Sequence, residues 1–529
     1  MILFEDSQWL VVNKPTGLAT HAGKPGELGA VEWLALHVEQ KVHVVSRLDR
    51  GTSGVLVFAK NAAASARAQA IHEASEGLKT YRFISTVDSN KLGLPTTWER
   101  DDELDGKSAR TTFTRLAASD DDRFVHYQAE ISRGRKHQIR RHAQSSGVSL
   151  LGDDQYGGAV FSRLCLHCAQ VSWPGISEPL IAAEPQAFTA LLKATAGDAE
   201  LAVCFDRRGE WLQSITDAFR VVHRDEIPGL PAAVDVYGSW FNAVWFDETA
   251  TANEQDKLLQ PVLTAISQQY GCLGGVVRTH RRNPHQRSLV KEVTVVGETP
   301  PEVFTVTEHG LAYEINLLKT QHTGLFLDQR DSRRRTADVA KNARVANLFA
   351  FTCSFSLVTA QHGAEVVFSI DTAKPCLTTG KTNFSLNGLN ESGQGKFVQE
   401  DVRKWLGRQL RKAKKEGDDW TGYQLIVCDP PVFASSKDGG KFSVADEWAG
   451  LASSCAQLLT PGGVAVFANN HRTGDHKYYH DSLCSVFDEV LELRPPLDFP
   501  IFPGRRHYVR TFWCQSSDSS NSMGLISGK

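Results

Sequence analysis

A series of short apolar runs between residues 343 and 470 constrains the fold of this chain more than any other sequence feature. The runs are separated by segments of helical character, and they read ARVANLFAF, EVVFSID, GKFVQED, YQLIVCDPP and GGVAVFANN. Strands that alternate with helices pair in parallel, because each crossover returns the chain to the same edge of the sheet. The sequence therefore predicts a doubly wound, Rossmann-like α/β domain over residues 311–516.

The N-terminal part of the chain has a different pattern. Residues 1–190 alternate β-type runs with glycine-rich turns, as in WLVVN, GVLVFAK, TYRFIST and HYQAEIS. This pattern is typical of a mainly antiparallel α+β domain. We expect a connector over residues 191–228, a small α+β domain over 229–310, and a disordered, Ser-rich tail over 517–529. The predicted fold class is thus multidomain α+β and α/β.

Composition excludes several classes of protein. The chain has 529 residues and no apolar run of the about 18 residues that a membrane helix needs. Its early acidic residues do not resemble a signal peptide. The cysteines lack zinc-site spacing, since a strand would send Cys165 and Cys168 to opposite faces. We expect a cytoplasmic protein with reduced thiols, no bound metal and no membrane partner.

Basic residues bunch locally, although the net charge is −3. Acid-free basic runs occupy residues 133–142, 278–288 and 403–415. A solvated face is the ordinary interpretation of any one run. Their position beside candidate active sites favours contacts with the phosphates of RNA.

Asp49 lies between two arginines in the run Arg47-Leu48-Asp49-Arg50, directly before the apolar run VLVFAK. Neighbouring cations favour an ionised carboxylate, and a desolvated carboxylate can act as a nucleophile on a sugar or an electrophilic ring. By itself, such a run is more often a surface ion pair.

Further motifs surround Asp49 in the sequence. They are Asn13-Lys14-Pro15-Thr16-Gly17-Leu18 with His21, Lys79-Thr80-Tyr81, Gly134-Arg135-Lys136-His137-Gln138-Ile139-Arg140, Leu151-Gly152-Asp153 with Tyr156-Gly157, and Arg163-Leu164-Cys165-Leu166-His167. In this order they closely resemble the RluA family of pseudouridine synthases, over about residues 1–185.

The resemblance implies an enzyme that isomerises uridine in RNA without a cofactor. It implies Asp49 as the nucleophile and Arg140 as the cation that holds Asp49 ionised. Tyr81 would stack on the target base and assist proton removal, and Arg47 would fill the space that the extruded uridine leaves. The sequence departs from the family at Ser46, where the family usually has histidine, and we interpret this as a local change of hydrogen bonding.

Acidic residues follow the strands of the predicted parallel sheet. Asp371 ends one strand, Asp401 follows the next, and Asp429 follows the strand YQLIVC. In such sheets, ligands bind beyond the carboxyl ends of the strands. One such aspartate alone is often a helix N-cap. Their series, after a turn of small residues at 347–356, predicts a class I methyltransferase that uses S-adenosylmethionine (SAM).

Other runs resemble the RlmK/RlmI group of ribosomal RNA methyltransferases, over about residues 215–516. They are Pro228-Gly229-Leu230-Pro231, Thr323-Gly324-Leu325-Phe326-Leu327-Asp328-Gln329-Arg330, Asn383-Phe384-Ser385-Leu386-Asn387-Gly388, and Asp429-Pro430-Pro431-Val432-Phe433-Ala434-Ser435-Ser436-Lys437. The resemblance implies SAM contacts from Asn347, Phe349, Thr352, Ser354, Asp371, Asp401 and Asp429. It implies that Pro430, Pro431, Phe433 and Asn469 face the target base. Cys353 stands where this group commonly has glycine, so we expect crowding near the cofactor.

The methylated atom is constrained by the cysteines. Methylation of cytosine C5 needs a cysteine nucleophile, but Val432 follows the two prolines, and residues 467–472 read FANNHR. Cys428 is expected to point into the core. Guanine N7 has a free lone pair that can attack the SAM methyl group once positioned. We therefore favour N7 methylation of guanine.

The shared substrate of the two modules is expected to be RNA, either large-subunit ribosomal RNA (rRNA) or a ribosomal assembly intermediate. Alternatives remain methylation of cytosine C5 or an exocyclic amine, and one module serving only as an RNA-binding platform.

Overall fold

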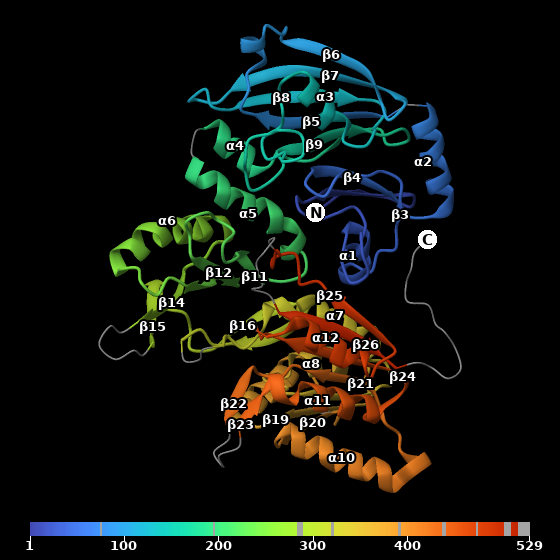
Figure 1. The fold of residues 1–529 in the computed structure, drawn as a ribbon, viewed down its shortest axis with the longest axis vertical. Coiled ribbons are helices and arrows are strands. Elements are labelled where there is room, and N and C mark those ends of the chain that lie inside the picture. Colours follow the sequence, from blue (N-terminus) through green and yellow to red (C-terminus); the bar gives the residue numbers. More distant parts are fainter. Residues whose placement is uncertain are drawn as a thin grey trace.

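A computed structural model describes residues 1–74, 77–193, 196–282, 289–318, 322–389, 393–435, 441–471, 474–501 and 509–516. The predicted tail at 517–529 lies outside the described residues, as do 283–288 of one basic run, Ser436 and Lys437 of one motif, and Arg472. The molecule is elongated, with the N-terminal sheet at one end and the C-terminal sheet at the other (Figure 1).

The N-terminal strands that the structure describes form one ten-stranded sheet, in the order β1-β2-β4-β9-β5-β8-β7-β6 with β3 and β10 at its sides. Its strands are β1 (Ile2–Glu5), β2 (Trp9–Lys14), β3 (His43–Val44), β4 (Ser53–Ala59), β5 (Leu78–Ser85), β6 (Thr97–Leu104), β7 (Lys107–Ala118), β8 (Val125–Ile131), β9 (Leu166–Ser172) and β10 (Leu180–Ile181). Its helices are α1 (Ala30–His37), α2 (Ala62–Ala74), the short η1 (Ser89–Leu92) and α3 (Gln138–Ser145). Pairing is antiparallel except between β4 and β9. The predicted, mainly antiparallel α+β fold is confirmed.

Strand β4 lies where this sheet is covered on both faces. Every residue of SGVLVFA in β4 is buried, which explains why the run shows no alternation of polar and apolar residues. Helix α2 packs on it. The loop that carries Asp49 leads directly into β4, so Asp49 is attached to the most buried strand of the sheet.

A second, five-stranded sheet of order β11-β12-β13-β14-β15 follows. Its elements and their neighbours are α4 (Gln186–Leu192), α5 (Ala196–Gln213), β11 (Ala218–Val222), β12 (Ala232–Tyr237), β13 (Trp240–Trp245), α6 (Ala252–Tyr270), β14 (Gly274–Arg282), β15 (Leu289–Gly297), and the hairpin β16 (Phe304–Glu308) and β17 (Leu311–Ile315). Residues 191–228, predicted as a connector, instead contain α5 and the edge strand β11, which pairs with β12. The short run AFRVV is a strand because this pairing buries it, which its sequence alone does not indicate.

The C-terminal sheet has seven strands in the order β20-β19-β18-β21-β24-β26-β25. The described elements of this region are η2 (Leu327–Gln329), α7 (Arg330–Ala337), β18 (Arg344–Leu348), α8 (Ser354–Gln361), β19 (Val366–Asp371), α9 (Lys374–Leu386), β20 (Gly395–Gln399), α10 (Val402–Glu416), η3 (Gly417–Asp419), β21 (Tyr423–Cys428), α11 (Val444–Leu458), β24 (Leu459–Asn469), α12 (His476–Cys484), β25 (Glu489–Leu493) and β26 (Arg510–Gln515), together with β22 (Phe433–Ser435) and β23 (Lys441–Ser443), which form a separate two-stranded sheet. Strands β18 to β21 and β24 are parallel, and β26 and β25 are antiparallel additions. The predicted doubly wound domain is confirmed.

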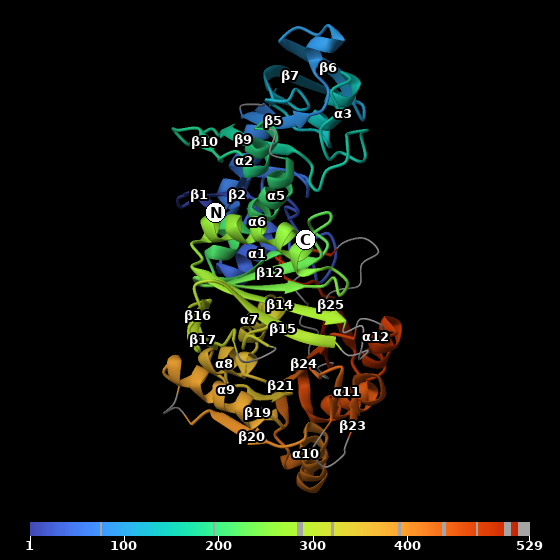
Figure 2. The same ribbon diagram turned by 90° about the vertical axis from the view of Figure 1, so that its left-hand side faces the viewer.

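The part of the chain that forms the N-terminal sheet packs against the rest of the molecule through α1. Helix α1 contacts α7, and the views in Figures 1 and 2 agree that α1 lies between the N-terminal sheet and the C-terminal part. The Trp33 ring lies 4.6 Å from that of Trp211. His37 stacks on His309 with ring centroids 5.0 Å apart, and its Nε2 lies 3.2 Å from Asp331. Aromatic and charged contacts therefore fix the N-terminal module against the C-terminal one.

Candidate active sites

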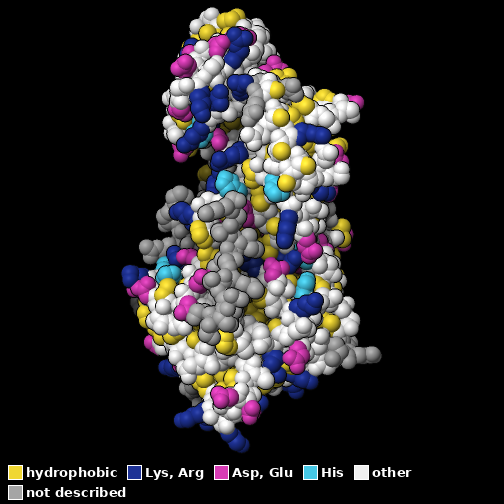
Figure 3. Space-filling model, turned by 90° about the vertical axis from the view of Figure 1, so that its right-hand side faces the viewer, with side chains coloured by type: hydrophobic (Ala, Val, Ile, Leu, Met, Phe, Trp, Pro, Cys, Tyr) yellow, Lys and Arg dark blue, Asp and Glu magenta, His cyan; other side chains and the backbone are white. Residues whose placement is uncertain are grey.

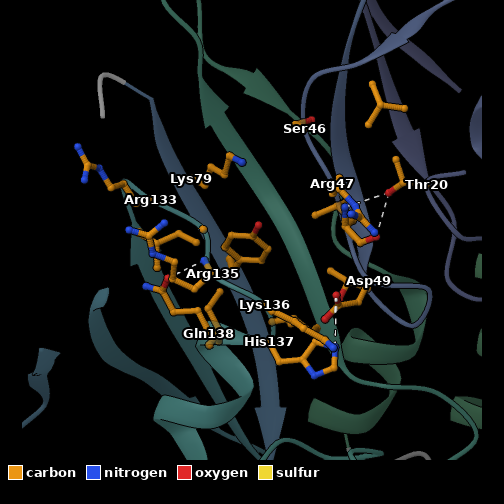
Figure 4. Close-up of a pocket in the computed structure, with 18 of the residues that line it drawn as sticks. Thr20, Ser46, Arg47, Asp49, Lys79, Arg133, Arg135, Lys136, His137 and Gln138 are labelled. Carbon is orange, nitrogen blue, oxygen red and sulfur yellow. Dashed lines mark hydrogen bonds and ion pairs between the residues drawn. The ribbon is translucent and has the colours of Figure 1, made fainter. Parts of the chain in front are cut away.

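A large cleft opens beside β4 and β5 in the N-terminal module. Its volume is about 1470 Å³. Figure 4 shows Arg47 and Asp49 on one wall, and Lys79, Arg133 and Arg135 on the facing wall. Among the residues that line the cleft, Asp49 is the sole carboxylate. The cleft therefore suits an anionic ligand, part of which would approach the carboxylate of Asp49.

The loop that carries Asp49 is clamped by the segment before α1. The Thr20 hydroxyl donates to the Leu48 carbonyl at 2.9 Å and accepts from the Leu48 N–H at 3.0 Å. The Thr16 hydroxyl donates to the Gly51 carbonyl at 2.9 Å. Bonds on both sides of Asp49 hold its backbone in place, which is what a pre-organised reactive group requires.

The guanidinium of Arg140 and the imidazole of His137 face the Asp49 carboxylate, whose side chain is 35% exposed. Arg140 Nη1 lies 3.6 Å from Oδ2, and His137 Nε2 lies 3.7 Å from Oδ1. Arg140 makes shorter contacts with Asp153, which accepts hydrogen bonds from its Nε and Nη2, both at 2.7 Å. The ring of Tyr156 lies under the same guanidinium at 4.9 Å. Arg140 is thus anchored by Asp153 and presents its remaining nitrogen to Asp49.

Tyr81 lines the cleft from β5 and is only 6% exposed. Burial, with the neighbouring Cys168, raises the pKa of Tyr81 well above its usual value, so the phenol is protonated at neutral pH. Burial also lowers the pKa of Lys14 to about 7, aided by the charge of Arg163. Lys14 donates to the carbonyls of Pro15 at 3.0 Å and Leu18 at 2.6 Å, so it stabilises the segment before α1 (residues 15–29, the clamp segment) that holds the Asp49 loop.

Ser46 stands where the resembled family has histidine. Its hydroxyl donates to the Val57 carbonyl at 2.9 Å and accepts from the Val57 N–H at 3.0 Å. The serine therefore joins the Asp49 loop to β4. Arg47, the next residue, is exposed at the cleft.

His137 and Asp153 belong to this site but were not identified as site residues from the sequence. His137 has a φ of 55° at the start of α3, a conformation that L-residues rarely adopt. Burial lowers its pKa, opposed by the charge of Asp49. Both residues lie in the quoted motifs Gly134–Arg140 and Leu151–Asp153, and strained backbone beside a carboxylate is the feature that marks His137.

In the C-terminal module, the loop after β18 has an unusual backbone. Phe349, Phe351 and Cys353 have φ angles of 56°, 48° and 64°. Such left-handed residues cluster where a ligand approaches the backbone closely. The Thr352 hydroxyl donates to the Gly324 carbonyl at 2.6 Å, and Asn383 Nδ2 donates to the Thr352 carbonyl at 3.0 Å. The loop is thus fixed from two sides, ahead of Ser354, which begins α8.

The aspartates at the strand ends have different surroundings. Asp371 accepts from the Phe351 N–H at 2.9 Å and the Ala373 N–H at 2.8 Å. Each of its oxygens has a second lone pair, so the carboxylate can still accept from ribose hydroxyls. Asp401 is the N-cap of α10 and pairs with Arg403 at 3.0 Å. It therefore has the capping role that one strand-end aspartate often has, in addition to any contact with a cofactor.

Two residues predicted to affect SAM binding, Asn347 and Cys353, have side chains that lie beneath the loop. Asn347 is 2% exposed and its amide donates to the Ser356 hydroxyl at 2.9 Å, so it lies beneath the loop rather than at its surface. Its position in β18 directs the side chain inward. The buried Sγ of Cys353 lies 3.6 Å from the Phe351 carbonyl and faces α9, where a Cβ added at Gly380 would lie 2.4 Å from it, and the crowding near the cofactor stays a prediction.

Asp429 directly follows β21 and is partly buried. Burial, with the nearby charge of Asp328, raises the pKa of Asp429 to about 7, and Arg333 acts in the opposite direction. Next to it, Pro430 is buried and Pro431 is exposed. Phe433 is 70% exposed and lies 6.2 Å from the ring of His471.

Asn469 ends the neighbouring strand β24 and accepts from the His471 N–H at 2.8 Å. Cys428 precedes Asp429 and is buried against Cys455, which raises the pKa of its thiol well above the usual value. A buried, protonated thiol is a poor nucleophile. The described residues thus place an exposed aromatic ring and polar side chains after β21 and β24, with no reactive thiol there.

Two absences can be stated for the described part of the chain. Within it, no group of three or more His, Cys, Asp or Glu side chains could hold a metal ion. No helix in the same residues is both long and apolar enough to cross a membrane.

Sequence comparisons match the two sites to two families. The profile of the RNA pseudouridylate synthases matches residues 8–145, which contain Asp49, Tyr81 and Arg140. The profile of the S-adenosylmethionine-dependent methyltransferases matches residues 257–487, which contain the loop after β18 and Asp429. The chain therefore combines a pseudouridine synthase region with a methyltransferase region whose cofactor is SAM.

Individual relatives match the methyltransferase. Ribosomal RNA large subunit methyltransferase K of Neisseria meningitidis is 31% identical over 260 residues, which are 49% of this chain and 70% of the relative. Ribosomal RNA large subunit methyltransferase K/L of Shewanella baltica is 34% identical over 261 residues, 48% of this chain and 34% of that larger protein.

Among solved structures, a methyltransferase complexed with SAH has a TM-score of 0.51 and 23% identity, covering 61% of this chain and 81% of its own, which supports the fold. The chain belongs to the family of ribosomal RNA large subunit methyltransferase K, and it carries an RNA pseudouridylate synthase region in front of its methyltransferase region.

Proposed function

We propose that this protein modifies RNA at two sites, isomerising a uridine to pseudouridine in the N-terminal cleft and methylating a base at the edge of the C-terminal sheet. The observation that carries this proposal is the convergence of Asp49, His137 and Arg140 within 4 Å in a cleft lined by cations. A cationic cleft attracts the RNA backbone, while a clamped carboxylate supplies the chemistry.

In the N-terminal cleft, Asp49 acts as the nucleophile. The bond that Asp49 forms to the nucleotide is transient and breaks again before release; overall, the N1–C1′ bond of the uridine breaks, a C5–C1′ bond forms, and a proton moves from C5 to N1, so nothing is gained or lost. Arg140 and His137 hold Asp49 ready for attack, and Arg47 occupies the space vacated by the extruded base. The raised pKa of Tyr81 favours a stacking role over service as a base in its own right.

In the C-terminal module, SAM supplies an electrophilic methyl group when bound. Phe349, Thr352 and Ser354 belong to the loop that would hold it, Asp371 would accept from its ribose hydroxyls, and Asp401 at the start of α10 would contact it from the other side. Asp429 and the exposed Phe433 position the target base, with Pro430, Pro431 and Asn469 around them.

Guanine N7 is our favoured methyl acceptor. Its lone pair would attack the methyl group directly, which would break the sulfur–methyl bond, release S-adenosylhomocysteine and leave a positive charge on the base. An ionised Asp429 offsets that charge, and the buried Cys428 thiol argues against a cysteine-dependent attack on cytosine C5. The names of the relatives favour large-subunit rRNA as the substrate, either free or in an assembly intermediate.

The proposal is tested with the purified full-length protein and rRNA from cells that lack the gene. Pseudouridine formation without SAM, and methyl transfer on its addition, are the expected results. Asp49→Asn should abolish only the first reaction. A calorimetric titration that detects no SAM binding would instead favour the alternative in which the methyltransferase module is an RNA-binding platform.

A further inference from the structure

The clamp segment before α1 also touches the C-terminal sheet. Gly26 has a φ of 80°, and a Cβ added there would lie 2.0 Å from the carbonyl oxygen of Glu492 in β25. The Arg494 N–H donates to the Gly26 carbonyl at 3.0 Å. This close backbone contact requires glycine, and it fixes Arg494 relative to the loop that holds Asp49.

One carboxylate at this contact is shared by two arginines from different modules. Glu27 Oε2 lies 3.1 Å from Arg50 Nη2, and its Oε1 lies 3.5 Å from Arg494 Nη2. The side chains of Arg50 and Arg494 are 60% and 43% exposed, whereas that of Glu27 is 14% exposed. The group therefore carries an excess positive charge on its solvent side.

Arg50 connects this group to the cleft, since it follows Asp49 and lines the cleft wall. Exposed cations also stand nearby at Arg47 and Lys24. Figure 3 shows Lys and Arg side chains gathered over the upper part of one face of the molecule, where the N-terminal sheet lies. Each guanidinium has five donors, so the exposed guanidinium groups of Arg50 and Arg494 have donors left for a phosphate in addition to their contacts with Glu27.

We propose that Arg494 extends the RNA-binding surface of the N-terminal cleft across the module boundary. An RNA strand that places its uridine at Asp49 continues over Arg50 and binds Arg494 through a backbone phosphate. The C-terminal module thus contributes to binding of the RNA substrate at the N-terminal site. This inference rests on the proposed function, because it takes RNA as the ligand of the cleft.

The test measures filter binding and pseudouridine formation by the full-length protein, using rRNA from cells that lack the gene, over a series of salt concentrations. Arg494→Ala should weaken binding and raise KM about three- to tenfold at low salt, with kcat unchanged. The slope of log K against log salt should fall by about 1, as for the loss of one phosphate contact. Arg494→Lys should retain most of the affinity.

Arg123→Ala is the matched control, because Arg123 is 56% exposed and pairs with Asp121 on a distant turn. It should leave affinity and salt slope unchanged. Glu27→Gln should bind RNA at least as tightly as the wild type, since it frees both guanidinium groups. Equal affinity and slope in Arg494→Ala and the wild type would overturn the proposal. So would a fall in kcat alone, which would make Arg494 a positioning residue that acts through Glu27.

The binding data separate this proposal from the proposed function. If the wild type binds the RNA without forming pseudouridine, the catalytic proposal fails, while the salt slopes still decide the role of Arg494. A wild type that neither binds nor modifies the RNA contradicts both.

Discussion

The ion pair between Arg140 and Asp153 gives a prediction whose magnitude follows from its geometry. Arg140 donates twice to Asp153 at 2.7 Å, and the two side chains are 9% and 0% exposed. Removing one partner of a buried pair costs about 3–5 kcal/mol, because the remaining charge is left uncompensated. We expect the lower end, about 3 kcal/mol, because Asp49 remains 3.6 Å from Arg140.

Asp153→Asn keeps the shape of the side chain and removes its charge. At about 2–4 °C per kcal/mol, the N-terminal module should melt about 6–12 °C lower. Pseudouridine formation should also fall, because Arg140 loses its anchor. Thermal melting followed by tryptophan fluorescence measures the first effect. Asp101→Asn is the control, since Asp101 pairs with Arg110 where both side chains are exposed, and it should not shift melting. If both variants melt like the wild type, the reasoning about Arg140 is wrong.

Three predictions concern the methyltransferase module. Because the pKa of Asp429 is raised to about 7, the carboxylate is protonated below that pH and ionised above it. The rate of methyl transfer should therefore rise with pH, with a midpoint near pH 7. Asp328→Asn should move that midpoint lower, because the charge of Asp328 raises the pKa of Asp429. An unchanged profile in Asp328→Asn would contradict this. Asp371→Ala should weaken calorimetric SAM binding about 10- to 100-fold, the value of one or two charge-assisted hydrogen bonds, without affecting pseudouridine formation. Cys353→Gly should change SAM affinity less than about twofold, because Sγ faces Gly380; a large gain would mean that Cys353 does crowd the cofactor.

Local sequence was sufficient for the parts of the fold whose pattern is determined by their own residues. The parallel strands β18, β19, β21 and β24 follow from apolar runs bounded by turns. Local sequence did not predict β11, because its five residues become a strand through pairing with β12. Burial by distant partners is not encoded in a short run.

The same limit applies to the sites. Motifs bring Asp49, Tyr81 and Arg140 to one cleft, but sequence does not show that Asp153 takes the shorter contacts of Arg140. The sequence position of Cys353 suggested crowding, whereas the direction of its side chain depends on α9 packing beside it. The contact between Gly26 and β25 joins residues from opposite ends of the chain and has no sequence signature.

We propose that one chain carries two independent RNA-modifying sites. The most direct test of this proposal maps modified nucleotides in total RNA from cells that lack the gene and are complemented with the wild type, Asp49→Ala or Asp429→Ala. We predict that Asp49→Ala loses one pseudouridine and keeps the methylated guanine, and that Asp429→Ala does the reverse. If Asp49→Ala leaves every pseudouridine in place, or if deletion removes neither mark, the account of two catalytic modules is contradicted.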